Sequence, residues 1–581
     1  MGKRQRAGPS LSPAAEVASA RGVGEGGALS GGSQAVLFTS LMEFFIVLFC
    51  TAYSLFCVNA YVLNAGSLKL SVPLLSILLV TELALLGWAA RSMIIIHRGY
   101  RATAWAILVF LISLGISLDK SPSLLPKSWS ADYPNHYILI DFLSTNEQLP
   151  ILTSGLGEMV QYPFGPSLVT ALSAKMTGLP LMTMTGILAA LISAFLVVTV
   201  YLLARKFLDR YETGSTMAGA AAAISALMVF SVPVYYLGQY CADFYYSMMY
   251  GELLVLLTLL ALMHIEDGER LWIYVFIIAT TGIIFTYSLF IVIPVCALIL
   301  FALLNPEKIQ GIINRTSIGA GVLSVILFLL FTVERMKIGT HILQYEGLAV
   351  EPDLMNFNLI FIALIAFGTI LSQKTTRDFA RSALSIYCGI VIAEFLGFFL
   401  LSQTGIIAAY YAKKTLFLLV LLLPVVACLP VLYAVRQGVG ERHRSAALYG
   451  IIGLIAIFSV FTALTYPVQE KPVVTPEDVL FAQKAEIYLH NHNIPYQNLS
   501  ITTGELKGYW FGLLLHIDKN YASQRFLANA TPFSEWLQDP DARYVVGEMV
   551  NATYPEFFEM KGVRLQIVVR EGQKVLIRKV D

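Results

Sequence analysis

Charged residues are scarce in this chain. Of its 581 residues, 57% are hydrophobic and only 13% are charged, whereas a soluble domain of ordinary composition carries roughly a quarter charged residues. This excludes a soluble globular protein and predicts an integral membrane protein. Acidic and basic residues nearly cancel to a net charge of +1, which excludes a strong electrostatic attraction to nucleic acid.

Cysteine is also scarce, and a leader pattern is missing. The six cysteines lie almost entirely within apolar runs, without a CxxC pair, which excludes a disulfide framework and a thiolate metal site. Residues 1–34 hold four basic residues but no apolar block directly after them, so a cleavable signal peptide is not expected. Their Gly, Ser and Ala content predicts a disordered cytoplasmic tail.

Long apolar runs are abundant instead. A bilayer core about 30 Å thick needs about 20 apolar residues per helix. Candidate spans lie near residues 36–61, 72–96, 103–118, 183–204, 216–236, 248–265, 271–287, 288–304, 316–333, 355–372, 383–401, 407–435 and 446–465. The run 271–304 is too long for one helix, and "TTGIIFTYS" with Pro294 predicts that it turns back within the membrane. This gives about thirteen spans.

Basic residues recur in every second loop between these spans. The loops carry Arg91, Arg98 and Arg101; Arg205, Lys206 and Arg210; Arg270; Lys308 and Arg315; Lys374, Arg377 and Arg381; and Arg436, Arg442 and Arg444. Such loops face the cytoplasm under the positive-inside rule. We therefore expect a multi-pass plasma-membrane protein with a cytoplasmic N-terminus. Loop 119–182 and everything after Tyr466 then lie outside, provided that 271–304 counts as two spans.

The composition changes after residue 466. Residues 35–466 form the expected transmembrane domain, and residues 467–581 form an extracytoplasmic domain. In the latter, "TPEDVLFAQKAEIYLHNHN" predicts an amphipathic helix after a Thr-Pro cap, and "NLSITT", "ARYVVGE", "LQIVVRE" and "KVLIRKV" predict short strands. The expected fold class is a polytopic α-helical membrane protein with a small C-terminal α/β domain.

The outer loop 119–182 is rich in carboxylates. Its stretch "SWSADYPNHYILIDFLSTNEQLPILTSGLGEMVQYPFGPSLVTAL" carries Asp132, His136, Asp141, Glu147 and Glu158. The chain must enter the membrane only once between this loop and the next basic loop. Residues 164–177, although apolar, are therefore expected to form a helix on the outer membrane surface.

This loop and its surroundings resemble the GT-C superfamily of membrane glycosyltransferases, which use polyprenyl-phosphate-linked sugars, in its bacterial and archaeal members. The matching stretches are "DYPNHYILIDFL", "QLPIL", "YPFGPSLVTALSAKMTGLPL", the span ending "VYLLARKF", "ADFYYSMMYGELLVLLTLLAL" and "AAYYAKKTLFLLVLLLP". The resemblance covers residues 103–581, including the small C-terminal domain. It implies a GT-C-like fold and the transfer of a hexosyl or pentosyl group from a lipid-linked donor to a glycan, lipid or protein acceptor, as in the synthesis of cell envelope glycans.

Asp132 is the candidate catalytic base. Sugar transfer from a lipid phosphate needs a base for the acceptor's proton and a group that holds the departing phosphate. A carboxylate at the membrane boundary suits the first task because partial desolvation raises its proton affinity, and the resemblance places the superfamily's loop carboxylate at Asp132. His136, one helical turn away, could orient Asp132 or contact the phosphate. Alternatively, Asp132 caps a helix that begins near Pro134, with His136 solvated.

Two lysines are candidates for the phosphate. Lys413 and Lys414 follow Tyr410 and Tyr411 at the outer edge of a long span, where cations can bind a lipid phosphate. All four are therefore candidate donor-binding residues. In the alternative interpretation, the lysines extend to the lipid headgroups and the tyrosines form an aromatic belt.

Asp243 and Glu158 are candidates for an acceptor contact or a second carboxylate. Asp243, in the second outer loop, could face Asp132 across a cavity, and either residue could equally be a solvated loop carboxylate. Two carboxylates could hold a divalent cation such as Mg²⁺ or Mn²⁺ that bridges the phosphate. No DxD spacing occurs, so the need for a metal stays open.

Two other functions fit part of the pattern. A transporter could use Glu82, Glu252 and Glu394, which lie within apolar runs, as an ion relay, although the two halves lack the self-similarity expected of inverted repeats. An oligosaccharyltransferase or glycan polymerase shares the layout, but the WWDYG signature of the former is absent and the closest strings are "WSADYP" and "KGYWFG". The expected partners are a lipid-linked sugar donor, its acceptor and membrane lipids.

Overall fold

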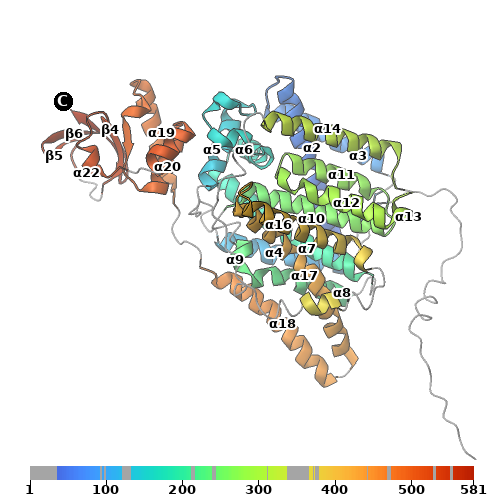
Figure 1. Cartoon of the computed structure of the whole chain (residues 1–581). Helices are drawn as coiled ribbons and strands as arrows, with labels where there is room; N and C mark the ends of the chain where they lie inside the picture. The colour runs from blue at the N-terminus through green and yellow to red at the C-terminus, as the bar shows by residue number, and fades with distance from the viewer. Residues whose placement is uncertain are drawn as a thin grey trace, which may run out of the picture.

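A helical bundle with a small sheet domain at its side makes up the chain (Figure 1). A computed structural model describes residues 36–38, 40–91, 94–96, 100–120, 132–210, 216–237, 244–310, 312–336, 365–370, 372, 379–440, 442–467, 473–527, 531–549 and 554–580. The expected tail 1–34 and most of the expected span 355–372 lie outside these residues.

Seven of the described helices are long and apolar enough to cross a membrane. They are α2 (Leu41–Ala65), α4 (Tyr100–Lys120), α7 (Leu181–Leu208), α10 (Tyr246–Glu266), α14 (Arg315–Met336), α16 (Ala383–Gln403) and α17 (Ala409–Gly440). Five more expected spans contain shorter apolar stretches, in α3 (Val72–Ala90), α8 (Thr216–Leu227), α11 (Trp272–Ile284), α12 (Val292–Leu304) and α18 (Arg442–Thr465). The structure is a polytopic helical bundle, and the count of about thirteen spans stays a prediction.

The first expected span begins later than its apolar pattern suggests. Strand β1 (Val36–Phe38) pairs in parallel with strand β2 (Ile94–Ile96). Both segments are therefore strands where the sequence predicts the ends of helices. Helix α2 begins only after Ser40, whose side chain accepts a hydrogen bond of 3.1 Å from the backbone N–H of Glu43. This cap sets the start of the helix, since an apolar run alone does not distinguish a strand from a helix.

Helices α7, α10 and α17 lie at the centre of the bundle. The apolar stretch of α10 is entirely buried, and 83% of that of α7 and of α17 is buried. Only 17% of the apolar stretch of α14 and 22% of that of α16 is buried. Leucine and isoleucine side chains on α14 and α16 are exposed. Because lipid tails are as apolar as these side chains, this exposure is expected of helices that face lipid.

Several of the basic loops meet at one end of the bundle, which we call the basic end. There Arg210 pairs with Glu266 at 2.5 Å, and Lys308 pairs with the same carboxylate at 3.7 Å. At the opposite end, Tyr287 lies 5.6 Å from the ammonium group of Lys414, at the start of α17. Tyr287 stands between α11 and α12, directly before η5 (Ser288–Ile291). The chain therefore reverses within 271–304, as its length predicts.

The outer loop forms a compact layer over the end opposite the basic end. It comprises α5 (Asp132–Asn146), the short 3₁₀ turns η1 (Leu152–Ser154) and η2 (Gly157–Gln161), and α6 (Gly165–Thr177), which matches the predicted surface helix. The N–H of Gly165 donates to the carbonyl of Phe285 at 2.9 Å. A Cβ at this glycine would lie 2.4 Å from the Tyr53 hydroxyl, so only glycine allows α6 to begin this close to α2.

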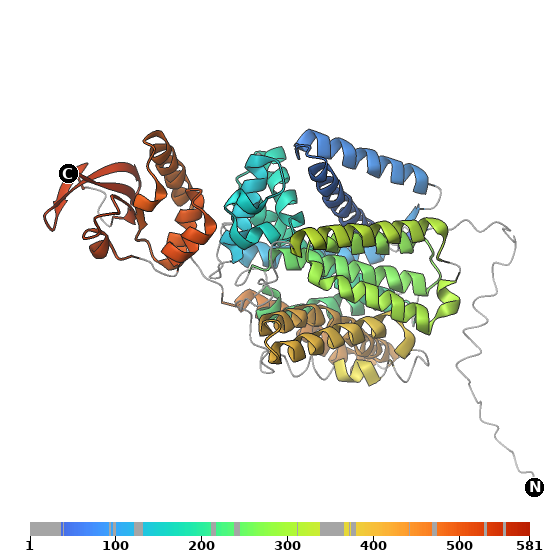
Figure 2. The ribbon, with the colours of Figure 1, turned by 45° about the horizontal axis from the view of Figure 1, so that its top comes forward.

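The C-terminal domain is an α/β unit, as expected. Its helix α19 (Pro476–Asn491) begins with a capping box between Thr475 and Asp478. Its sheet has the order β3-β4-β7-β6-β5, from β3 (Leu499–Ile501), β4 (Tyr544–Glu548), β7 (Lys574–Val580), β6 (Val563–Glu571) and the unpredicted β5 (Phe557–Met560). In both views the sheet lies away from the bundle, and α19 and the helix over residues 505–514 lie toward it (Figure 2). Helix α20 (Glu505–Leu514) contacts α5.

Candidate active site

Asp132 is the first residue of α5 and lies against α17. Its carboxylate accepts a hydrogen bond from the Tyr410 hydroxyl and is within electrostatic reach of Lys414. Burial raises the pKa of Asp132 above its ordinary value, although Lys414 and the Tyr410 hydrogen bond act in the opposite direction. A carboxyl group in this setting binds a proton more tightly than a solvated one, which is the property that a general base needs.

The alternative of a simple cap at Asp132 placed the helix start near Pro134. The described part of the helix begins at Asp132, and Pro134 lies within the first turn of that part. The carboxylate is engaged with a residue of the transmembrane bundle, so its role extends beyond the local geometry of α5.

Lys414 sits in an aromatic cage rather than among lipid headgroups. Its ammonium group lies 4.1 Å from the ring centre of Tyr410, 4.3 Å from that of Tyr245 and 5.6 Å from that of Tyr287. Only 2% of the residue is exposed. Tyr410 and Lys414 are four residues apart in α17, which places them on one helix face. Ring faces stabilise a buried ammonium group without neutralising it.

The other two members of the predicted donor-binding set lie at the edge of this cage. The Tyr411 ring packs 5.4 Å from that of Tyr410, and its hydroxyl interacts electrostatically with Asp132. Lys413 precedes Lys414 by one position, so it points about 100° away around the helix, and it is only half-buried. The structure thus distinguishes the two lysines, which the sequence did not.

His136 is buried among aromatic rings. It is 2% exposed and packs edge-on against Tyr162 and Tyr246, with ring centres 5.2 and 5.9 Å apart. Burial, together with the charge of Lys414, lowers the pKa of His136 to about 3, so the imidazole is neutral at ordinary pH. Its Nδ1 has no hydrogen-bond partner among the described residues. A solvated His136, one of the two expectations, is therefore wrong.

Glu158 forms an ion pair with Lys519. Both charges act on Asp132, Lys519 lowering its pKa and Glu158 raising it. Glu158 was a predicted site residue, but Lys519 was not. It belongs to α21 (Lys519–Ala522) of the C-terminal domain, and nothing in "HIDKNYA" indicates a partner in a loop so distant in the sequence.

The C-terminal domain is fixed to α5 by polar and aromatic contacts. The Tyr509 hydroxyl donates to the side-chain carbonyl of Asn135 at 2.6 Å, and the Trp510 ring lies 5.6 Å from that of Tyr133. His516 bridges Asp141 of α5 at 2.8 Å and Glu486 of α19 at 2.5 Å. Several of these residues directly follow Asp132 in the sequence, so domain docking and the site share one helix.

Of the remaining acidic candidates, only Glu252 reaches this cluster in the described part of the chain. Asp243 lies outside the described residues. Glu82 accepts a hydrogen bond from Asn59 at 2.8 Å, the two carboxylate oxygens of Glu394 lack a partner among the described residues, and only Glu252 interacts with Lys414. This scattered arrangement does not favour an ion relay.

A metal site needs several ligand side chains close together. No group of three or more His, Cys, Asp or Glu side chains that could hold a metal ion occurs within the described residues. Asp243, one of the candidate carboxylates, lies outside these residues, and a site for Mg²⁺ or Mn²⁺ stays a prediction.

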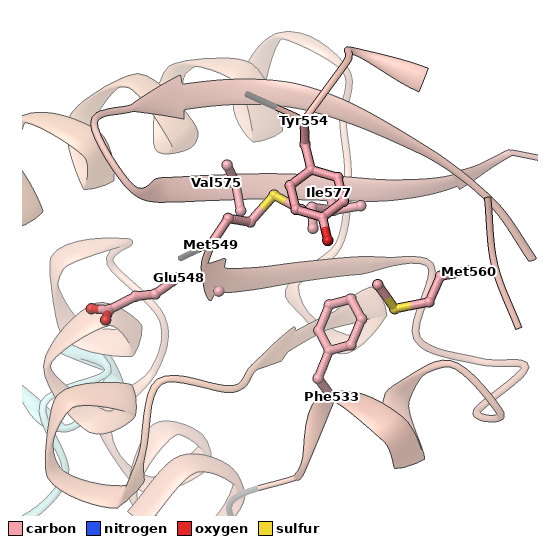
Figure 3. Close-up of a pocket in the computed structure, with 8 residues that line it drawn as sticks. Phe533, Glu548, Met549, Tyr554, Met560, Val575 and Ile577 are labelled. Carbon is pink, nitrogen blue, oxygen red and sulfur yellow. The ribbon is translucent and has the colours of Figure 1, made fainter. Parts of the chain in front are cut away.

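A separate apolar cavity of about 220 Å³ lies in the C-terminal domain (Figure 3). It is lined by Phe533, Gly547, Glu548, Met549, Tyr554, Met560, Val575 and Ile577. Glu548 points away from the rings of Phe533 and Tyr554 in Figure 3 and pairs with Lys507 at 2.6 Å. The cavity shares no residue with the Asp132 cluster.

No family model matches the sequence, and no curated protein matches it. Solved structures that are similar to the chain include the following two. ArnT from Cupriavidus metallidurans in the apo state is 13% identical, with a TM-score of 0.46 over 82% of this chain and 97% of its own. The arabinofuranosyltransferase AftD from Mycobacteria is 11% identical, with a TM-score of 0.47 over 82% of this chain and 40% of its own. At these values the likeness does not assign a family or an activity.

Proposed function

We propose that this protein is a membrane glycosyltransferase of the GT-C type. It would transfer a hexosyl or pentosyl group from a polyprenyl-phosphate-linked donor to a glycan, lipid or protein acceptor. The observation that carries the proposal is the juxtaposition of a half-buried carboxyl group, Asp132, with a buried cation, Lys414, where the outer loop meets α17. The resemblance of the loop to the GT-C superfamily, and the arabinofuranosyltransferase named among the similar structures, are consistent with it.

The chemistry divides between these two groups. The acceptor hydroxyl gives its proton to the Asp132 carboxylate as its oxygen bonds to the anomeric carbon of the sugar. The bond from that carbon to the phosphate oxygen breaks, and the electron pair leaves with the phosphate. The Lys414 ammonium group balances the charge that develops there, and because the cage excludes water this interaction is strong.

The proposed orientation of the protein in the membrane follows from the positions of the basic loops. Arg210 and Lys308 meet at the basic end, which faces the cytoplasm under the positive-inside rule. The Asp132 cluster and the C-terminal domain lie at the opposite end and would face outward from the plasma membrane. Donor lipid would reach the site from the outer leaflet, where its phosphate lies at the level of the start of α17.

The test is Asp132→Asn, which preserves shape and removes the proton acceptor. Membranes containing the variant should transfer sugar from a radiolabelled polyprenyl-phosphate donor at least about 100-fold more slowly than wild type. Asp119→Asn is the matched control, because that side chain is 59% exposed at the end of α4, and it should be fully active. Normal transfer by Asp132→Asn at equal expression would remove Asp132 from the role of base.

A further inference from the structure

The C-terminal domain brings a buried cation to the Asp132 cluster. The side chain of Lys519 is only 5% exposed, and it pairs with Glu158, which is 37% exposed. A lysine that is this buried needs a partner to remain charged. Glu158 supplies it from the outer loop, so the pair joins two parts of the chain that are far apart in sequence.

The backbone around this pair is closely fitted. The N–H of Lys519 donates to the carbonyl of Gly155 at 2.9 Å. Gly157 has a φ of +55°, and a Cβ there would lie 2.5 Å from the side-chain oxygen of Asn520. Asp518 caps α21 by accepting from the N–H groups of Asn520 and Tyr521. The position of Lys519 is thus set by main-chain geometry, in contrast to that of a mobile surface lysine.

The charges around Asp132 then form a balanced set. Two carboxylates, Asp132 and Glu158, lie with two ammonium groups, Lys414 and Lys519. Among the described residues, the titratable and charged groups that interact with Asp132 include Tyr162, Tyr287, Tyr410, Tyr411, Tyr509, Glu158, Lys414 and Lys519. Because an ordinary tyrosine titrates near pH 10, the carboxylates and lysines set the local charge at neutral pH.

We infer that Lys519 is a positioning residue of the Asp132 site: its ammonium group holds Glu158 and offsets the negative charge of Asp132, so the site is complete only when the C-terminal domain is docked on α5. This inference rests on the proposed function, with Asp132 as the base. Lys519 acts through Asp132 and Glu158 and need not touch the substrate. The domain is in this view a structural component of the site, in addition to any role in recognising the acceptor.

The pH profile of sugar transfer tests the inference. Transfer requires ionised Asp132, so its rate falls on the acid side as that carboxylate is protonated. Lys519→Met removes a charge that favours the ionised form, and the acid limb should move up by about one pH unit. Glu158→Gln removes a charge that disfavours it, and the limb should move down by about half a unit because Glu158 is partly solvated. A merely structural role would not produce shifts of opposite sign.

Three controls make these results specific. Lys519→Arg keeps the charge and should leave the limb in place. Lys484→Met breaks another ion pair of the same domain, with Glu571, and should also leave it in place. If the acid limb of the pH profile stays in place in both Lys519→Met and Glu158→Gln, the inference is overturned. If Lys519→Met does not fold, the downward shift of Glu158→Gln carries the test.

A second measurement does not depend on activity. An amine-reactive reagent should label Lys519 far more slowly than Lys484, whose side chain is 47% exposed, both in wild type and in Asp132→Asn. Equal labelling rates would show an undocked domain and overturn the inference. An active Asp132→Asn variant would instead overturn the proposed function, so the two failures are distinguishable.

Discussion

Replacing Lys414 by methionine should lower kcat/KM for the lipid-linked donor roughly 10- to 150-fold. The substitution keeps most of the length of the side chain and its apolar stem, and it removes the charge. A hydrogen bond from a charged group contributes about 1.5–3 kcal/mol, and each 1.36 kcal/mol corresponds to a factor of about ten. Because Lys414 is 2% exposed and enclosed by the rings of Tyr245, Tyr287 and Tyr410, solvent cannot replace it.

The assay is transfer from a radiolabelled polyprenyl-phosphate sugar in detergent or proteoliposomes, with kcat and KM measured separately. If Lys414 acts mainly on the departing phosphate, kcat falls more than KM rises. Lys413→Met is the matched control, since it removes the same charge from the neighbouring position, and it should stay within about threefold of wild type. Wild-type kinetics for Lys414→Met, or equal losses in both variants, would refute the assignment of the phosphate to the cage.

Three further outcomes are expected. Gly165→Ala should lower stability by about 1–3 kcal/mol, seen as a lower thermal midpoint, because its Cβ would meet a tyrosine hydroxyl at 2.4 Å; Gly115→Ala, with open space around its Cβ, should not. The hydrogen bond to Asp141 and a second carboxylate raise the pKa of His516 to about 9. Protonated His516 therefore stabilises docking below about pH 6.5, its ordinary value, and this contribution is lost as the pH rises through 9; the thermal midpoint of His516→Gln should lack that dependence. Tyr410→Phe removes the hydroxyl bonded to the candidate catalytic base, so the acid limb of the rate should move to higher pH, while the affinity for donor stays near that of wild type.

Local patterns predicted much of the fold because membrane helices are specified by continuous stretches of sequence. The length of the apolar run and the alternating basic loops predicted the reversal within 271–304, and the Thr475 cap predicted the start of α19. The same reasoning placed a helix at 36–38 and 94–96, where two distant segments pair as strands. Strand pairing depends on a partner elsewhere in the chain, which an apolar run of three residues does not reveal.

The part of the candidate site whose residues lie in recognisable sequence motifs was predictable. Asp132, Tyr410 and Lys414 were singled out from two short stretches that resemble one superfamily, and the structure brings them together. Lys519 could not be found in this way, because its significance arises only from the docking of two domains. The choice between Lys413 and Lys414 was equally hidden, since it depends on which face of α17 is turned toward α5.

The arrangement around Tyr410 brings an aspartate and a lysine into one site. Tyr410 contacts both groups with different parts of its side chain, donating its hydroxyl to Asp132 and offering its ring face to Lys414. A carboxylate can accept a proton, and an ammonium group can donate N–H bonds to a phosphate, so the two side chains offer complementary chemistry. A buried site for transfer from a lipid phosphate needs this division, because the acceptor's proton and the departing phosphate must be received at the same time by groups of opposite charge.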